Sequence, residues 1–142
     1  LDGDQAPLPA PTPQGTRVLL VEDNPVNQRM ARHMLTRNGC DVDLAENGLV
    51  AVEKAASGEY DLVLMDCSMP VMDGFEATRR IRAGEVGTGR RVPIVALTAN
   101  AMPGDRENCI EAGMDEYLAK PVTIEQLTAM IAAVAGRAAN SD

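Results

Sequence analysis

Short apolar runs alternate along the chain with segments of helical periodicity, and this alternation constrains the fold more than any other feature. The runs of strand length are Val18–Val21, Val42–Ala45, Leu62–Met65, Ile94–Leu97 and, more weakly, Glu116–Ala119. Three of them are apolar throughout, which is typical of parallel strands that are covered on both faces. Five strands alternating with helices predict an α/β fold with a parallel sheet, and right-handed crossovers make it doubly wound.

Several helix boundaries carry local signals. Asn24 and Pro25 are a typical N-cap and first helical residue, and Asn38-Gly39 is a typical helix end. Thr123–Gln126 has the pattern of a capping box. The first helix carries an apolar stripe of Val26, Met30 and Met34. The second helix, at about 48–57, carries an apolar stripe of Leu49, Val52 and Ala56. Three further helices are expected near Gly74, over 103–112 and after Thr123.

Composition divides the chain into a linker, one domain and a tail. Residues 1–15 contain prolines at every second position from 7 to 13 and few large apolar side chains, so we expect an extended, semi-rigid linker. Residues 16–135 are expected to form the domain, and residues 136–142 a disordered tail. A start without an initiator Met indicates a fragment of a longer protein.

Charge and aromatic content argue against several classes of partner. The net charge is −8 and aromatic residues make up 2 % of the 142 residues, so neither a basic patch nor a stacking surface for nucleic acid is expected. No apolar run approaches the roughly 18 residues of a membrane-spanning helix. Three scattered cysteines are typical of a reducing compartment. The acidic balance permits a hard cation as ligand.

Polar residues follow four of the five predicted strands. Glu22-Asp23, Asp66, Thr98 and Lys120 come directly after the first, third, fourth and fifth runs. Ligands of open α/β sheets bind at the carboxyl ends of the strands. Each residue alone has an ordinary explanation, such as a helix N-terminal charge, a turn cap or a solvated side chain. Four independent coincidences at four strand ends are improbable, so we expect one site.

The chemistry of that site follows from its charges. Glu22, Asp23 and Asp66 would lie within a few ångströms of one another, and each pair at ~4 Å repels by about 4 kcal/mol at an effective dielectric constant near 20. Oxygen-only ligands select Mg²⁺, with Mn²⁺ as an alternative, over Zn²⁺. Together with Lys120 and Thr98, such a cation would neutralise the oxygens of a phosphoryl group, with Asp66 as nucleophile.

Four segments carry a family resemblance, namely Val18–Gln28, Leu64–Arg82, Val92–Ala101 and Ala112–Pro121. They make the chain from about 17 to 135 resemble the receiver domains of response regulators and, most closely, of bacterial hybrid sensor histidine kinases. The resemblance implies a flavodoxin-like, doubly wound (βα)5 fold with a five-stranded parallel sheet in the strand order 2-1-3-4-5. The first acidic residue is Glu22, where many receivers carry Asp.

The resemblance also implies a metal site. Asp66 would be the phosphorylated aspartate and a ligand of Mg²⁺. Asp23 would bind the cation directly, Glu22 through water, and Ser68 through its backbone carbonyl.

Other residues would form the switch. Thr98 would turn toward the phosphoryl group and Tyr117 would move between an outward and an inward position. Lys120 would contact phosphate, and its bond to Pro121 is expected to be cis.

The implied partners belong to a phosphorelay. The donor would be a phosphohistidine on a kinase dimerisation module in the same or another chain, and the next acceptor a histidine-phosphotransfer domain. The domain would promote its own phosphorylation and dephosphorylation. The resemblance places it in the cytoplasm, within a hybrid kinase whose remainder is anchored in the inner membrane.

Three alternatives share parts of this pattern. A flavodoxin-like electron carrier needs a phosphate loop where Glu22-Asp23-Asn24 stands, and aromatic residues around a flavin. An aspartate-based phosphatase needs a second Asp two residues after Asp23, where Pro25 stands. A docking module that is not phosphorylated would share this fold, but the presence of the acidic pair, Asp66, Thr98 and Lys120 argues against it.

Overall fold

The computed structural model describes residues 16–67, 72–98, 104–120 and 122–140. Within them, five strands alternate with five helices, as the apolar runs predict. The strands are β1 (Arg17–Val21), β2 (Asp41–Ala45), β3 (Leu62–Asp66), β4 (Ile94–Thr98) and β5 (Glu116–Ala119). The helices are α1 (Pro25–Arg37), α2 (Gly48–Ala55), α3 (Gly74–Glu85), α4 (Asp105–Ala112) and α5 (Ile124–Asn140). The expected linker, residues 1–15, lies outside the described residues.

The helix ends use the signals that the sequence carries. The Asn24 side chain accepts hydrogen bonds from the backbone N–H groups of Val26 and Asn27, and Pro25 opens α1. The capping box before α5 is confirmed, because Thr123 and Gln126 each donate a backbone N–H to the other's side chain, at 3.0 and 3.1 Å. Helix α5 continues to Asn140, beyond residue 135. Among the described residues, no helix is both long and apolar enough to cross a membrane.

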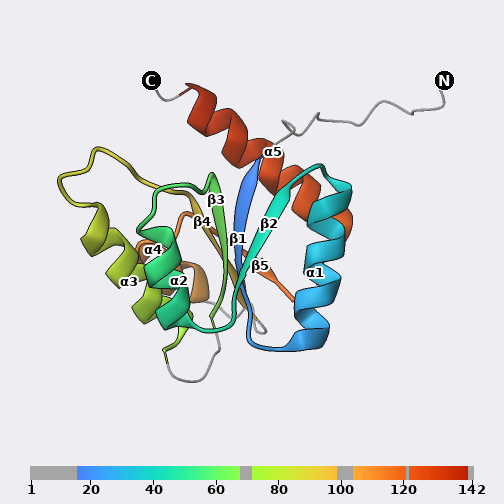
Figure 1. Cartoon of the computed structure of the whole chain (residues 1–142), viewed down its shortest axis with the longest axis horizontal. Helices are drawn as coiled ribbons and strands as arrows, with labels where there is room; N and C mark the ends of the chain where they lie inside the picture. The colour runs from blue at the N-terminus through green and yellow to red at the C-terminus, as the bar shows by residue number, and fades with distance from the viewer. Residues whose placement is uncertain (1–15, 68–71, 99–103, 121, 141–142) are drawn as a thin grey trace.

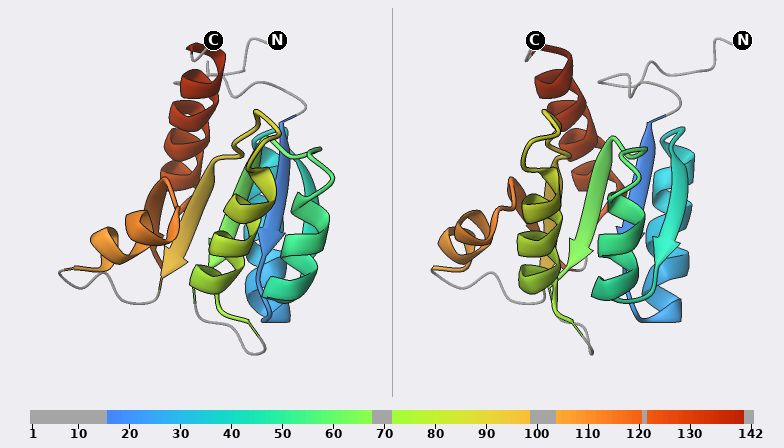
Figure 2. Two further views of the ribbon diagram at one scale, coloured as in Figure 1. Left: turned by 90° about the vertical axis from the view of Figure 1, so that its left-hand side faces the viewer. Right: turned by 60° about the vertical axis from the view of Figure 1, so that its left-hand side comes forward.

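The five strands form one parallel sheet in the order β2-β1-β3-β4-β5, which confirms the predicted fold and the edge position of β2. Helices α1 and α5 cover one face of the sheet, and α2, α3 and α4 cover the other (Figure 1). All strands run in the same direction, so their carboxyl ends lie along one edge (Figure 2). Asp66 pairs with Leu97 in the register, and Thr98 pairs with Ala119. The residues predicted to form the site are therefore carried to the same edge.

Each face of the sheet has its own apolar core. Along β1, Leu19 and Val21 belong to the core beneath α2, α3 and α4, while Val18 and Leu20 belong to the core beneath α1 and α5. All four are 0 % exposed. This two-sided burial explains why the strand is apolar at each of its last four positions, and each such side chain contributes about 1.5–3 kcal/mol of transfer free energy.

Of the apolar stripe predicted for α1, Met34 packs against the core and the first two residues do not. Val26 and Met30 are 57 % and 51 % exposed, whereas Leu35 is the residue of α1 that is fully buried. In α2 the predicted stripe is likewise divided, because Leu49 is exposed while Val52 packs against the core, beside the buried Ala51. Helical spacing identified side chains that share a face, but it did not identify which face the sheet covers. An apolar stretch of α1 is therefore open to solvent.

Candidate functional site

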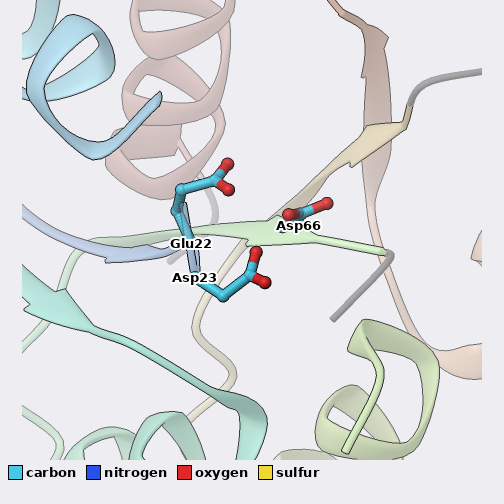
Figure 3. Close-up of side chains that lie close together, drawn as sticks. All are labelled: Glu22, Asp23 and Asp66. Atoms are coloured by element: carbon cyan, nitrogen blue, oxygen red, sulfur yellow. The ribbon is translucent and has the colours of Figure 1, made fainter. Parts of the chain in front are cut away.

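Three carboxylates converge at the carboxyl edge of the sheet. Glu22 and Asp23 follow β1, and Asp66 is the last residue of the neighbouring strand β3. One carboxylate oxygen from each of the three lies within 4.8 Å of the others. Figure 3 shows the three side chains turned toward a common space. Glu22 and Asp66 are each 2 % exposed and Asp23 is exposed, so the cluster is buried on one side and open on the other.

Lys120, which follows β5, bridges the two buried carboxylates. Its Nζ lies 3.3 Å from Oε1 of Glu22 and 3.2 Å from Oδ1 of Asp66. Its backbone N–H donates to the carbonyl oxygen of Thr98, which ties the end of β5 to the end of β4. Burial on its own lowers the pKa of the Lys120 ammonium, but the charges of Asp66 and Glu22 more than offset this and raise it. The ammonium is therefore charged at neutral pH.

The buried position of Glu22 makes its negative charge costly. Burial raises the pKa of this carboxyl above its ordinary value of 4.5, and the charge of Asp66 raises it further. The backbone N–H of Asn24 and the Lys120 ammonium act in the opposite direction. Because the folded-state pKa is raised, the contribution of Glu22 to stability is present below pH 4.5 and is lost as the pH rises through the folded-state value. At neutral pH a further cation would relieve this cost.

The donor set fits a hard divalent cation. Three carboxylates with one open side offer only oxygen ligands, which suit Mg²⁺ or Mn²⁺ and are a poor match for Zn²⁺. The exposed carboxylate of Asp23 leaves room for the water molecules that Mg²⁺ retains. Glu22, Asp23 and Asp66 are the residues that would hold such an ion.

A glycine lets helix α3 approach the end of strand β3. A Cβ atom at Gly74 would lie 2.5 Å from the carbonyl oxygen of Asp66 and 2.9 Å from Cα of Cys67. Both neighbours are backbone atoms, so a side chain at this position would displace the end of β3. The Gly74 N–H donates to the carbonyl oxygen of Cys67, and the Asp73 side chain caps α3. The start of α3 therefore fixes the position of Asp66.

The predicted switch residues lie near the site. Thr98 ends β4 and is partly buried. Tyr117 lies in β5 opposite Ala96 and packs against the core beneath α3 and α4. Their movement on phosphorylation stays a prediction. Ser68 and the bond to Pro121 lie outside the described residues.

Two other reactive side chains, those of Cys67 and His33, are not part of the carboxylate cluster. Burial, the neighbouring Cys109 thiol and the charge of Asp66 raise the pKa of Cys67 to about 12, so Cys67 is not a thiolate at neutral pH. His33, the only histidine, is exposed on α1, more than two helical turns beyond the acidic pair.

The β1–α1 turn contributes three polar groups that sequence reasoning did not assign to the site. The Asn24 N–H and the Asn27 side-chain amide donate to Oε2 of Glu22, at 3.2 and 3.5 Å. The Gln28 side-chain amide donates to the backbone carbonyl oxygen of Glu22 at 2.7 Å. The available signal was two amide side chains on the first turn of a helix that follows an acidic pair.

Comparison with known proteins agrees with this arrangement. The family model for the response regulator receiver domain matches residues 18–132. Hybrid signal transduction histidine kinase G of Dictyostelium discoideum is 47 % identical over 120 residues, which cover 83 % of this chain but only 4 % of that kinase. The chain thus spans a small part of the curated kinases that it matches.

Two solved structures show the same fold. The receiver domain of sensor histidine kinase PA1611 from Pseudomonas aeruginosa PAO1, which has a magnesium ion coordinated in its active site cleft, is 52 % identical with a TM-score of 0.78, over 86 % of this chain and 98 % of that one. The second structure is a complex of the Saccharomyces cerevisiae histidine phosphotransfer protein Ypd1 with the receiver domain of Ssk1. The matching chain is 34 % identical with a TM-score of 0.82, over 91 % of this chain and 94 % of that one. With its acidic cluster, bridging lysine and strand order, this chain belongs to the response regulator receiver domain family.

Proposed function

We propose that the chain is a Mg²⁺-dependent phosphoacceptor of a two-component phosphorelay and that Asp66 takes the phosphoryl group. One observation carries the proposal. The carboxylate of Asp66 is buried beside two other carboxylates, all within 4.8 Å, and lies 3.2 Å from the Lys120 ammonium. This arrangement combines a nucleophile, a place for a divalent cation and a fixed positive charge.

In the proposed reaction, a carboxylate oxygen of Asp66 attacks phosphorus while the P–N bond of a donor phosphohistidine breaks. The imidazole leaves with the bonding electron pair and takes up a proton from water. Lys120 holds its ammonium against the charge that develops on the phosphoryl oxygens, and Thr98 offers a hydroxyl donor from the next strand end. After phosphorylation, Thr98 would turn toward the phosphoryl group and Tyr117 would move inward, and these two movements would form the switch.

Mg²⁺, when bound, supplies charge neutralisation for the phosphoryl oxygens. Asp23 and Asp66 would hold it directly, Glu22 through water, and the backbone carbonyl of Ser68 would complete the protein ligands. The magnesium ion in the receiver of PA1611 supports this proposal, because that domain is 52 % identical to this chain. Mn²⁺ would substitute, since it accepts the same oxygen donors.

Incubation with acetyl phosphate tests the proposal. With Mg²⁺, intact mass spectrometry is expected to show a gain of about 80 Da, the mass of one phosphoryl group. EDTA added before the phosphodonor should prevent the gain, because the three carboxylates then lack a cation. A chain that gains no mass at millimolar Mg²⁺ would instead be a docking module that is not phosphorylated.

We propose a helical partner that presents a phosphohistidine, because the relatives are histidine kinases and one solved receiver is paired with Ypd1. The exposed apolar side chains Val26 and Met30 lie on α1, next to the acidic cluster. A cavity of about 300 Å³ runs from Met30 to Glu22 and Lys120. An apolar side chain of the partner could enter it while the histidine reaches Asp66.

Helix α1 also differs in charge from the rest of the chain. It carries Arg29, Arg32 and Arg37 and no acidic residue, although the net charge is −8. None of the three forms an ion pair with a described side chain, whereas five arginines elsewhere do, namely Arg17, Arg79, Arg80, Arg82 and Arg91. This supports a partner whose docking surface is apolar at its centre and acidic at its rim.

Met30→Glu is expected to slow phosphoryl transfer from a phosphorylated histidine-phosphotransfer domain by about tenfold or more, because it places a charge at the centre of the proposed interface. Labelling by acetyl phosphate, which needs no protein contact, should be unchanged. Val86→Glu introduces the same charge at another exposed apolar residue, in the connection after α3, and should affect neither reaction. Equal slowing by both variants would contradict docking on α1.

The remaining proposals concern the parent protein. We propose that residues 16–135 form the receiver domain, that residues 1–15 link it to a preceding kinase module, and that residues 136–142 are a tail, into which helix α5 extends as far as Asn140. The domain would act in the cytoplasm, while its parent is anchored in the inner membrane. The kinase homology supports the kinase parent.

A further inference from the structure

The exposed carboxylate of Asp23 is not held in its direction by a contact with a described neighbour. Among the described residues, no hydrogen bond or ion pair holds its side chain, although a carboxylate oxygen lies within 4.8 Å of those of Glu22 and Asp66. Glu22 differs, since its carboxylate receives three donors, from Asn24, Asn27 and Lys120. The direction of the Asp23 side chain therefore depends on its backbone.

The backbone just before Asp23 is held on both sides. The N–H of Glu22 donates to the carbonyl oxygen of Ala45 on β2 at 3.0 Å. The carbonyl oxygen of Glu22 accepts the side-chain amide of Gln28 at 2.7 Å. That oxygen belongs to the planar peptide group joining Glu22 to Asp23, so fixing it fixes the rotation of the whole peptide plane. The plane in turn fixes the N–Cα bond of Asp23, and the peptide group on the other side of Asp23 is held by the Asn24 N–H, which donates to Oε2 of Glu22.

Gln28 is well placed for this task. It lies in α1, whose first turn is fixed by the Asn24 cap and Pro25, and it is partly buried. Its backbone N–H already donates to the carbonyl oxygen of Asn24 at 2.9 Å, as the helix requires. The side-chain amide takes no part in the helical hydrogen bond and instead donates across the turn to the carbonyl oxygen of Glu22. The contact therefore joins the helix to the peptide group from which the N–Cα bond of Asp23 extends.

We propose that Gln28 is a positioning residue for the metal site, holding the Glu22–Asp23 peptide so that the Asp23 carboxylate faces Asp66 before a cation arrives. The inference rests on the proposed function, because it takes the acidic cluster to be a cation site. Without the Gln28 amide, ordering of the turn would accompany metal binding and weaken it. Once the cation is bound, the geometry at Asp66 would be the same.

Gln28→Met tests the inference, because Met has a similar length and no hydrogen-bond donor. Mn²⁺ affinity, measured by the EPR signal of the free ion without any phosphodonor, is expected to fall about tenfold or more. Mg²⁺ affinity, measured by competition against Mn²⁺, should fall in parallel. The rate of labelling by acetyl phosphate at saturating Mg²⁺ should stay within about twofold of wild type, while the Mg²⁺ concentration for half-maximal rate rises.

Thr36→Met is the matched control. It places the same side chain at an exposed position in the last turn of α1, and metal affinity should not change. Equal Mn²⁺ affinity in wild type and Gln28→Met would overturn the role of Gln28 and leave the proposed function intact. A maximal rate that falls as far as the affinity would also overturn it, since the defect would then persist in the metal-bound site. A wild-type chain that binds neither ion would overturn both proposals.

Discussion

The Asp66→Asn chain is expected to gain no mass on incubation with acetyl phosphate and Mg²⁺, under conditions in which the wild type gains about 80 Da. The amide has the size and shape of the carboxylate but lacks the nucleophilic oxygen anion. Because Asp66 is only 2 % exposed, the amide of the same shape is expected to occupy the space of the carboxylate. Intact mass over a time course, followed by peptide mapping of the labelled wild type, measures the effect.

Asp73→Asn is the matched control for this loss. Asp73 caps helix α3 near the end of β3, and asparagine is an equally good N-cap, so folding and labelling should be retained. Labelling that persists in Asp66→Asn would contradict the assignment and point to another carboxylate of the cluster. Glu22 and Asp23 are the neighbours that peptide mapping would then have to distinguish.

The sequence predicted the fold and the gathering of the site because both depend on the ends of strands. A parallel sheet carries every carboxyl end to one edge, so a polar residue directly after an apolar run has a known destination. Glu22, Asp66 and Lys120 come together for this reason, although Lys120 lies 98 residues from Glu22 in the chain. The resemblance to receiver domains then supplied the strand order, which spacing alone did not determine.

Other features depend on three-dimensional detail that spacing does not contain. The stripe of Val26 and Met30 has helical spacing, but the choice between core and solvent depends on how α1 rotates against the sheet, and Leu35 occupies the core instead. Gln28 has no sequence signature as a support of the metal site, because its contact is with a backbone carbonyl that lies across a turn. Gly74 likewise gains its role from an approach of two backbones that only packing creates.

The β1–α1 turn contains both features that the sequence predicted and features that only the packing creates. Its carboxylates face the sheet edge, where the reaction would occur, and the exposed side chains of α1 face outward, where a partner would dock. Gln28 joins the two, because it is anchored in the helix and bonds to the carboxylate-bearing turn. A partner that shifts α1 would thereby act on the cation site, which links docking to phosphoryl transfer.

Lys120→Met is expected to change labelling and metal affinity in opposite directions. The rate of labelling by acetyl phosphate should fall about 100- to 1,000-fold, as is typical when one fixed charge or donor at developing oxyanions is removed. Mg²⁺ affinity should rise by about tenfold, because the ammonium that lies between Glu22 and Asp66 no longer repels the ion. Misfolding would lower both quantities, so the opposite signs identify an electrostatic effect.

The pH dependence of stability gives an independent readout of Lys120→Met. The ammonium lowers the pKa of Glu22, so its loss should raise that pKa further above 4.5. The metal-free variant should then be less stable than wild type at neutral pH, and the difference should shrink as the pH falls toward 4.5 or as Mg²⁺ is added, because either change removes the unbalanced carboxylate charge. Thermal unfolding at several pH values, with and without Mg²⁺, measures this difference in stability.

Lys54→Met is the matched control. It removes the only other lysine and its surface pairing with Asp43, and it should show neither the Mg²⁺ dependence nor the loss of labelling. A variant that binds Mg²⁺ more weakly than wild type would show that Lys120 supports the metal site and does not compete with the ion for the carboxylates.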